Sequence, residues 1–155
     1  MTKILFVCHG NICRSPMAEF LMKELVREQG LENDFYIESA ATSTEEIGNG
    51  VYPPVKRILK ARGIDPSAKY ARQMTRADYD RFDYIVCMDS KNLRNMGYIA
   101  IDTQGKYSKL LDFTNDAHDV ADPWYSGDFE TTEREIQEGC EALFEYILEK
   151  SQSTK

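Results

Sequence analysis

The sequence predicts an α/β fold, a single domain with a mostly parallel sheet and helices on both faces. At 155 residues the chain has the length of one ordinary domain. Short apolar runs that suit buried strands alternate with longer segments whose apolar residues recur at helical spacing. Such alternation is typical of parallel sheets, because each helix crosses back over the sheet before the next strand begins.

The first half of the chain contributes two strands and two helices. Residues 3–8 contain a continuous apolar run, Ile4 to Cys8, as expected of a strand buried on both faces. Prolines near helix starts and glycines after helix ends mark the helices that follow. In chain order the pattern predicts a strand at 3–8, a helix from Ser15-Pro16 to Gly30, a strand from Phe35 to Ala40, and a helix from Pro54 to Gly63.

The second half repeats the alternation and ends in one amphipathic helix. Its predicted elements are a short helix capped by Thr75, a strand from Asp83 to Met88, a helix from Ser90 to about Gly97, a weaker strand at Leu110-Leu111, a loop at 119–127, and a closing helix behind a capping box at Thr132 and Glu135. We expect the domain to span residues 1–150 and the tail at 151–155 to fray.

Composition and charge exclude several classes of function. The formal net charge of −7 repels phosphate backbones, which argues against nucleic acid and anionic membranes as partners. The apolar run at residues 4–8 is too short for a signal-peptide core or a membrane span, so we expect a cytoplasmic protein with reduced thiols. The four cysteines form no CxxC pair and the two histidines lie far apart, so no metal site is predicted.

The segment between the first strand and the first helix carries the main functional signal. It reads Cys8-His9-Gly10-Asn11-Ile12-Cys13-Arg14-Ser15, and ligands of α/β sheets bind beyond the carboxyl ends of strands. Backbone N–H groups of such a loop, together with a helix N-terminus, suit phosphate oxygens. We therefore predict a phosphate-binding loop in which Arg14 clamps the phosphate and the Cys8 thiolate attacks phosphorus.

A plainer interpretation of this loop stays open at this point. Cysteines are mostly buried and inert, so Cys8 would then be a small core residue at the end of a strand. Arg14 would be a surface charge, and Ser15 would be an ordinary helix cap. The strand-loop-helix context favours the phosphate-binding interpretation, because that context is what the motif requires.

Asp122 is the candidate general acid. The leaving group of phosphotyrosine is a phenolate, whose departure is helped by a proton from a carboxylic acid. Asp122-Pro123 lies in a predicted loop, and Trp124 and Tyr125 follow it as candidate flanks for a substrate ring. The dipeptide alone is weak support, since Asp65-Pro66 has the same pair and an ordinary turn explains it.

Six segments resemble the low-molecular-weight protein tyrosine phosphatases. They occur in order along the chain and read CHGNICRSP, ESAATST, ARQMT, YIVCMDS, DPWY and DFETT, and the likeness runs from about residue 3 to about residue 148. The resemblance implies a four-stranded parallel sheet and hydrolysis of phosphotyrosine in proteins or peptides without a cofactor. Inorganic phosphate is then the product and an expected inhibitor.

The resemblance also implies roles for supporting residues. Asn11 would brace the loop together with Ser39, and Ser15 would stabilise the thiolate as the phosphocysteine breaks down. Cys13 would form a reversible disulfide with Cys8, which makes Cys8 a redox-sensitive cysteine.

The chain departs from the pattern of its vertebrate relatives at two places. A histidine is common two residues before Ala-Arg-Gln, where this chain has Lys69, and the family partner of that histidine would be Asp89. A Lys69–Asp89 ion pair is therefore the expected replacement. Glu45 and Glu46 occupy a loop that helps choose substrates and is often aromatic or neutral in relatives, which favours substrates with basic residues near the phosphotyrosine.

Three rival functions stay open. Related arginine phosphatases place a threonine where this chain has the bulkier Ile12. Related arsenate reductases need a further cysteine pair, and Cys87 has no second cysteine in the segment from 88 to 112. The third rival is a phosphotyrosine-binding module without turnover, which the presence of a nucleophile, an arginine, a serine and an acid argues against.

Overall fold

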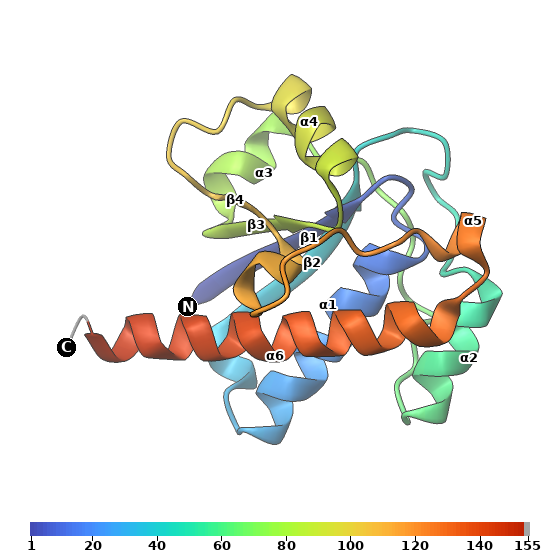
Figure 1. Ribbon diagram of the computed structural model, residues 1–155, viewed down its shortest axis with the longest axis horizontal. Helices are drawn as coiled ribbons and strands as arrows, with labels where there is room; N and C mark the ends of the chain where they lie inside the picture. Colours follow the sequence, from blue (N-terminus) through green and yellow to red (C-terminus); the bar gives the residue numbers. More distant parts are fainter. Residues whose placement is uncertain (154–155) are drawn as a thin grey trace.

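A four-stranded parallel sheet lies at the centre of the computed structural model, which describes residues 1–153 (Figure 1). The strand order is β2-β1-β3-β4, and all neighbouring pairs are parallel. The strands are β1 (Thr2–Cys8), β2 (Phe35–Ala41), β3 (Tyr84–Cys87) and β4 (Tyr107–Lys109). The predicted α/β class with four parallel strands is confirmed.

Helices cover both faces of this sheet (Figure 1). One face packs against α1 (Arg14–Glu28), α2 (Pro53–Ala61) and α6 (Phe129–Ser153). The other face packs against α3 (Arg76–Arg81) and α4 (Ser90–Ile99). The remaining helical turns are α5 (Pro123–Ser126) and two 3₁₀ turns, Glu32–Asp34 and Leu110–Phe113.

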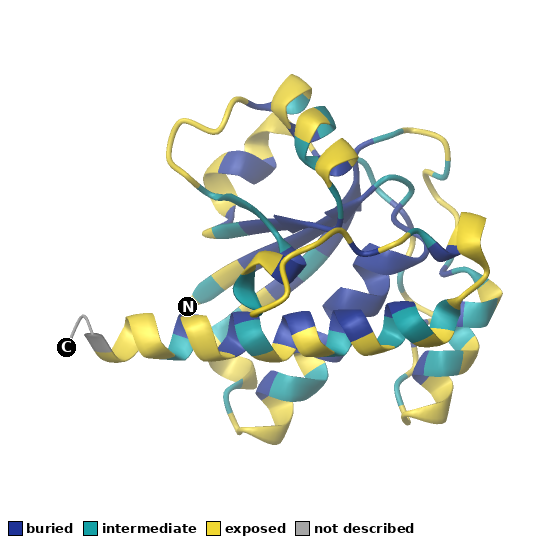
Figure 2. Cartoon of the chain, viewed as in Figure 1, coloured by how far each residue is buried: buried dark blue, intermediate teal, exposed yellow. Residues whose placement is uncertain are grey.

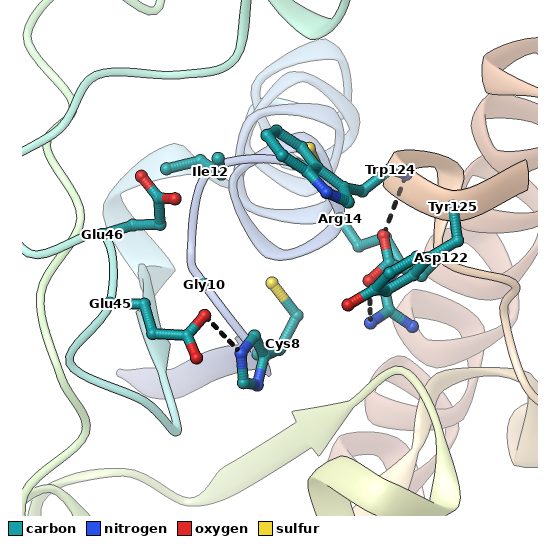
Figure 3. Close-up of a pocket in the computed structure, with 11 residues that line it drawn as sticks. Cys8, Gly10, Ile12, Arg14, Glu45, Glu46, Asp122, Trp124 and Tyr125 are labelled. Carbon is teal, nitrogen blue, oxygen red and sulfur yellow. Dashed lines mark hydrogen bonds and ion pairs between the residues drawn. The ribbon is translucent and has the colours of Figure 1, made fainter. Parts of the chain in front are cut away.

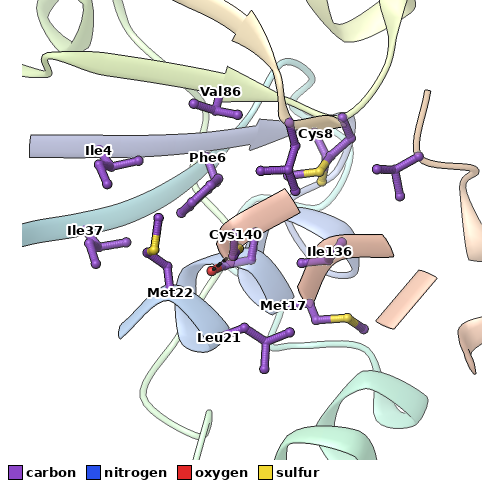
Figure 4. Close-up of a cluster of buried hydrophobic side chains, with 14 of the residues drawn as sticks. Ile4, Phe6, Cys8, Met17, Leu21, Met22, Ile37, Val86, Ile136 and Cys140 are labelled. Atoms are coloured by element: carbon purple, nitrogen blue, oxygen red, sulfur yellow. Dashed lines mark hydrogen bonds between the residues drawn. The ribbon is translucent and has the colours of Figure 1, made fainter. Parts of the chain in front are cut away.

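The central strand β1 contributes to the core on both of its sides. Ile4 and Phe6 pack into the cluster beneath α1 and α6, which Figure 4 shows in close-up. Leu5 and Val7 pack into the second cluster, beneath α3 and α4. All four side chains are completely buried, and Figure 2 shows most of the central part of the sheet in the dark blue of buried residues. The continuous apolar run therefore reflects a strand covered by helices on both faces.

Helix α6 is held closely against the segment that follows β4. Gly139 lies so near to Leu110 that a Cβ atom placed on Gly139 would come within 2.4 Å of the Leu110 Cγ atom. A glycine at this point lets the helix backbone approach the 3₁₀ turn more closely than any side chain would allow. Leu110 itself is completely buried.

The position of β1 in the sheet creates the crevice in which a ligand is expected. From β1 the chain passes through α1 to β2 on one side, and it reaches β3 on the other side only later. Connections that leave a strand in opposite directions open a crevice at its carboxyl end. The loop that begins at Cys8 lies at this end of β1.

The largest differences from the sequence prediction concern the fourth strand and the start of the last helix. The fourth strand is Tyr107–Lys109, whereas Leu110-Leu111 belongs to a 3₁₀ turn whose leucines fill the core. Helix α6 begins at Phe129, because Asp128 caps it by accepting a hydrogen bond from the Thr131 N–H at 3.0 Å. The predicted capping box at Thr132 is therefore wrong.

The other helix starts differ by a residue or two. Thr75 caps α3 as predicted, whereas α4 is capped by Asp89 rather than Ser90. The predicted loop at 119–127 contains the short helix α5. Helix α6 extends to Ser153, so residues 151–153 of the expected tail are helical, while 154–155 lie outside the described residues. Within residues 1–153 no helix combines the length and apolar character needed to cross a membrane.

Candidate active site

The loop from Cys8 to Ser15 curls around one cavity and is braced from its centre. Asn11 is buried and adopts a positive φ of 60°, a conformation that asparagine tolerates better than most residues. Its side-chain N–H₂ group donates to the Ser15 Oγ at 2.8 Å and to the Ser39 Oγ at 2.9 Å. Its oxygen accepts from the Arg72 backbone N–H at 3.2 Å. The loop conformation is thus fixed by the protein itself.

The Cys8 sulfur lies at the bottom of this cavity (Figure 3). Its Sγ is 3.0 Å from the Ser15 Oγ and accepts a hydrogen bond from the Ser15 backbone N–H at 3.4 Å. Ser15 is in the first turn of α1, whose N-terminus carries the positive end of the helix dipole. The sulfur therefore lies at the start of α1, in contact with both the hydroxyl and the backbone N–H of Ser15.

The three other cysteines are in surroundings that keep them protonated. Burial, followed by the charges of Cys8 and Asp122, raises the pKa of Cys13 to about 12. Burial also raises the pKa of Cys87 to about 12, and it raises the pKa of Cys140 as well. Of these three, Cys13 lines the same cavity as Cys8. No three His, Cys, Asp or Glu side chains in residues 1–153 are grouped to hold a metal ion.

Arg14 reaches the cavity from the first turn of α1, and its side chain is almost completely buried. One guanidinium nitrogen donates to the Asp89 carboxylate at 2.7 Å and to the Val120 carbonyl at 2.8 Å. Burial alone would lower the pKa of Arg14, but the charges of Cys8, Asp89 and Asp122 raise it above its usual value. A charged guanidinium is therefore fixed beside the sulfur.

Asp122 lies next to Arg14, on the side of the Cys8 sulfur opposite Glu45 and Glu46 (Figure 3). It caps α5, where one carboxylate oxygen accepts from the Trp124 backbone N–H at 3.0 Å. The other oxygen lies 3.5 Å from the second terminal nitrogen of Arg14. Thr132 ties the start of α6 to this segment by donating to the Ala121 carbonyl at 3.4 Å.

Aromatic side chains form the wall above Asp122. Trp124 and Tyr125 line the cavity and are 52% and 84% exposed, so both rings are accessible to a ligand. Trp124 packs against Tyr52, with ring centroids 4.8 Å apart. The structure therefore brings the predicted loop, the predicted acid and the predicted aromatic pair to one cavity, which His9, Gly10, Ile12 and Cys13 also line.

A buried charge network beneath the loop was missed in the sequence. Glu19 is 4% exposed and accepts from the Ser39 hydroxyl at 2.6 Å. Its carboxylate also pairs with Lys69 at 3.2 Å and with Lys23 at 2.6 Å. The sequence does contain a signal that Glu19 is buried, because helical spacing places it on the same face as Ser15, Met22 and Val26.

The predicted ion pair between Lys69 and Asp89 is wrong. Asp89 is engaged by Arg14, and the Lys69 ammonium donates instead to the Ser39 carbonyl at 2.8 Å and pairs with Glu19. Burial lowers the pKa of Lys69 below its usual value, although Glu19 opposes the shift. Lys69 thus supports the loop through Ser39, while Asp89 orients Arg14.

Replacing Glu19 by glutamine is expected to destabilise the protein by about 2–4 kcal/mol, because it leaves the ammonium of Lys69 buried without a counter-charge. The free energy of unfolding, measured by urea denaturation, checks this. Glu24→Gln is the matched control, since Glu24 lies on the same helix and its ion pair with Arg27 is largely exposed. Equal stability of the two variants would contradict a structural role for the buried pair.

The fold and the cavity together define a class of protein. It comprises α/β domains in which a cysteine, an arginine and an aspartate surround one small cavity at the end of the first strand. Over residues 3–153 the chain matches the model of one such family, the low molecular weight phosphotyrosine protein phosphatases. The chain belongs to this family.

Known relatives match nearly the whole chain. The low molecular weight protein-tyrosine-phosphatase YfkJ of Bacillus subtilis is 39% identical over 155 residues, which cover 98% of this chain and 99% of the relative. The crystal structure of YfkJ superimposes with a TM-score of 0.93 and covers 97% of this chain and 96% of YfkJ. The crystal structure of a Drosophila arginine phosphatase is 29% identical, with a TM-score of 0.85 and coverage of 94% and 98%.

Proposed function

We propose that this protein is a protein tyrosine phosphatase that hydrolyses phosphotyrosine monoesters through a phosphocysteine intermediate. The observation that carries the proposal is the convergence of the Cys8 sulfur, the Arg14 guanidinium and the Asp122 carboxylate on one cavity with an aromatic wall. Family membership supports the same activity.

In the first step the Cys8 thiolate attacks phosphorus, and the bond between phosphorus and the tyrosine oxygen breaks. Arg14 and the backbone of the loop hold the phosphoryl oxygens, whose charge they stabilise during transfer. Asp122, as the carboxylic acid, donates its proton to the departing phenolate. Trp124 and Tyr125 flank the substrate ring.

In the second step water attacks phosphorus, and the bond between phosphorus and sulfur breaks. Asp122, now a carboxylate, accepts a proton from the attacking water. The Ser15 hydroxyl, 3.0 Å from Sγ, stabilises the thiolate as it leaves. Inorganic phosphate is the product, and because it fits the same loop it is also an inhibitor.

The cavity argues against the rival substrates. Ile12 lines the cavity at the position where arginine phosphatases carry a threonine. Cys87 is completely buried with a raised pKa, which does not suit a relay of disulfides to arsenate. The Cys8–Cys13 disulfide stays a prediction: both thiols line the cavity and are unbonded in this structure.

A comparison of substrates tests the proposed function. We expect the reduced protein, without added metal, to hydrolyse a phosphotyrosine peptide at least about 100-fold faster than the same peptide with phosphoserine, whose shorter side chain holds its phosphate too near the backbone to reach Cys8. Phosphoarginine, and arsenate with a thiol reductant, serve as rival substrates. Faster turnover of either rival would overturn the proposal, and tight binding of the phosphotyrosine peptide without turnover would indicate a binding module.

A further inference from the structure

The mouth of the cavity has two chemically different sides. Trp124 and Tyr125 form the aromatic side, above Asp122. Glu45 and Glu46 lie on the other side of the Cys8 sulfur, in the segment between β2 and α2 (Figure 3). A phosphotyrosine whose phosphate rests on the loop would therefore have its ring beside the aromatic side and its neighbouring residues close to two carboxylates.

The protein holds both carboxylates in place. The Glu45 carboxylate pairs with the His9 ring nitrogen at 2.9 Å. The Glu46 carboxylate accepts from the Asn49 side chain at 2.6 Å. The Ser43 backbone N–H and hydroxyl both donate to the His9 carbonyl, at 3.1 and 2.9 Å, and fasten the segment to the phosphate loop. In each carboxylate only one oxygen has a protein partner within residues 1–153, which leaves the other oxygen to a ligand.

Glu46 also packs directly on the loop. A Cβ atom placed on Gly10 would lie 3.3 Å from the Glu46 Cγ, so the stem of this glutamate rests against the loop backbone. Its carboxylate is therefore within reach of residues next to the phosphotyrosine rather than of distant parts of a substrate.

The charge around the mouth is unbalanced. Among residues 1–153, three carboxylates line the cavity, those of Glu45, Glu46 and Asp122, and Arg14 is the only lysine or arginine that does so. Arg14 is already paired with Asp89, and it lies deep in the site where the phosphate binds. The outer rim is consequently anionic, and it repels an acidic residue beside the phosphotyrosine while it attracts a basic one.

We propose that Glu45 and Glu46 select phosphotyrosine segments in which a lysine or arginine adjoins the phosphotyrosine. This inference rests on the proposed function and specifies the class of peptide that the enzyme accepts. Glu45 is largely exposed, so each contact contributes in the range of surface ion pairs, and the selectivity comes from two contacts together with repulsion of acidic neighbours.

The inference is tested with three phosphotyrosine peptides that are identical except for the residues flanking the phosphotyrosine. These flanking residues are lysine in the first peptide, alanine in the second and glutamate in the third. We expect kcat/KM for the lysine peptide to exceed that for the glutamate peptide by about tenfold at low ionic strength. The ratio should fall as salt is added, because exposed charges are screened. In the double variant Glu45→Gln, Glu46→Gln the ratio should fall to about two or less.

The control is Glu28→Gln, Glu32→Gln, which changes the net charge equally. Both glutamates are exposed near the carboxyl-terminal end of α1, about 20 Å from the end that carries the loop. This variant should keep the wild-type ratio. Equal turnover of all three peptides by the wild type would overturn the inference and leave the phosphatase standing. A ratio unchanged in Glu45→Gln, Glu46→Gln would also overturn it. Failure to hydrolyse any peptide would overturn the proposed function and the inference with it.

Discussion

Replacing Cys8 by serine is expected to lower kcat for a phosphotyrosine peptide by at least about 10⁴-fold. A serine hydroxyl is un-ionised near neutral pH and is a far weaker nucleophile than a thiolate in the same place. No other cysteine can replace it, since burial keeps Cys13, Cys87 and Cys140 protonated. The loss is measured as the ratio of the turnover rates of the wild type and the variant on the same phosphotyrosine peptide.

Two further variants separate chemistry from binding. Cys8→Ser should still bind phosphate, because the loop backbone and Arg14 are unchanged, whereas Arg14→Ala should lose both binding and turnover. Cys87→Ser is the matched control: Cys87 is buried outside the cavity, where its thiol contacts the Asp89 carbonyl, and a hydroxyl can make the same contact. More than about 1% residual turnover in Cys8→Ser would rule out Cys8 as the nucleophile.

Replacing Asp122 by asparagine is expected to lower kcat for the phosphotyrosine peptide by about 10²-fold to 10⁴-fold. Asparagine has the same shape and can still accept the hydrogen bond from the Trp124 N–H, so the start of α5 should be preserved. The variant loses the proton that helps the phenolate depart and the carboxylate that accepts a proton from water in the second step, and kcat/KM reports only the first of these losses. A nitrophenyl phosphate, whose leaving group needs that proton less, should therefore be affected much less than the peptide.

The difference between the two substrates is the decisive readout for Asp122. An equal loss of kcat/KM on both substrates would mean that Asp122 acts in the first step by positioning Arg14 or Trp124 rather than by proton transfer. Asp116→Asn is the matched control, because Asp116 lies in the same segment with its side chain 93% exposed. It should retain wild-type activity on both substrates.

The parts of the fold that the sequence predicts well are those in which local pattern and tertiary packing agree. The run at residues 4–8 is apolar throughout because helices cover both sides of β1. The sequence prediction placed the fourth strand at Leu110-Leu111, a few residues after its position in the structure. The reason is that these two leucines are apolar like strand residues but fill the core from a 3₁₀ turn. Short apolar runs do not distinguish these two cases.

For the candidate site, the sequence predicts the proposed catalytic residues but not the buried ion pair that supports the loop. Cys8, Arg14 and Asp122 are identifiable because each lies in a segment whose local pattern points to a loop or a helix start. The partner of Lys69 could not be found in the same way, since Glu19 and Lys69 are distant in sequence and meet only when α1 packs on the sheet. Likewise, the sequence pattern at Thr132 resembles a helix cap, although Asp128 is the residue that caps α6 in the structure.

The close packing of Gly139 against Leu110 has a consequence for how the protein matures during synthesis. Domains fold as they emerge from the ribosome, amino-terminal parts first. The cysteine loop leaves the ribosome well before α6, yet α6 is the helix that fastens the segment carrying Asp122. A nascent chain that ends before α6 would expose the nucleophile without a fixed acid. Catalytic competence would thus arise only after α6 has emerged and packed.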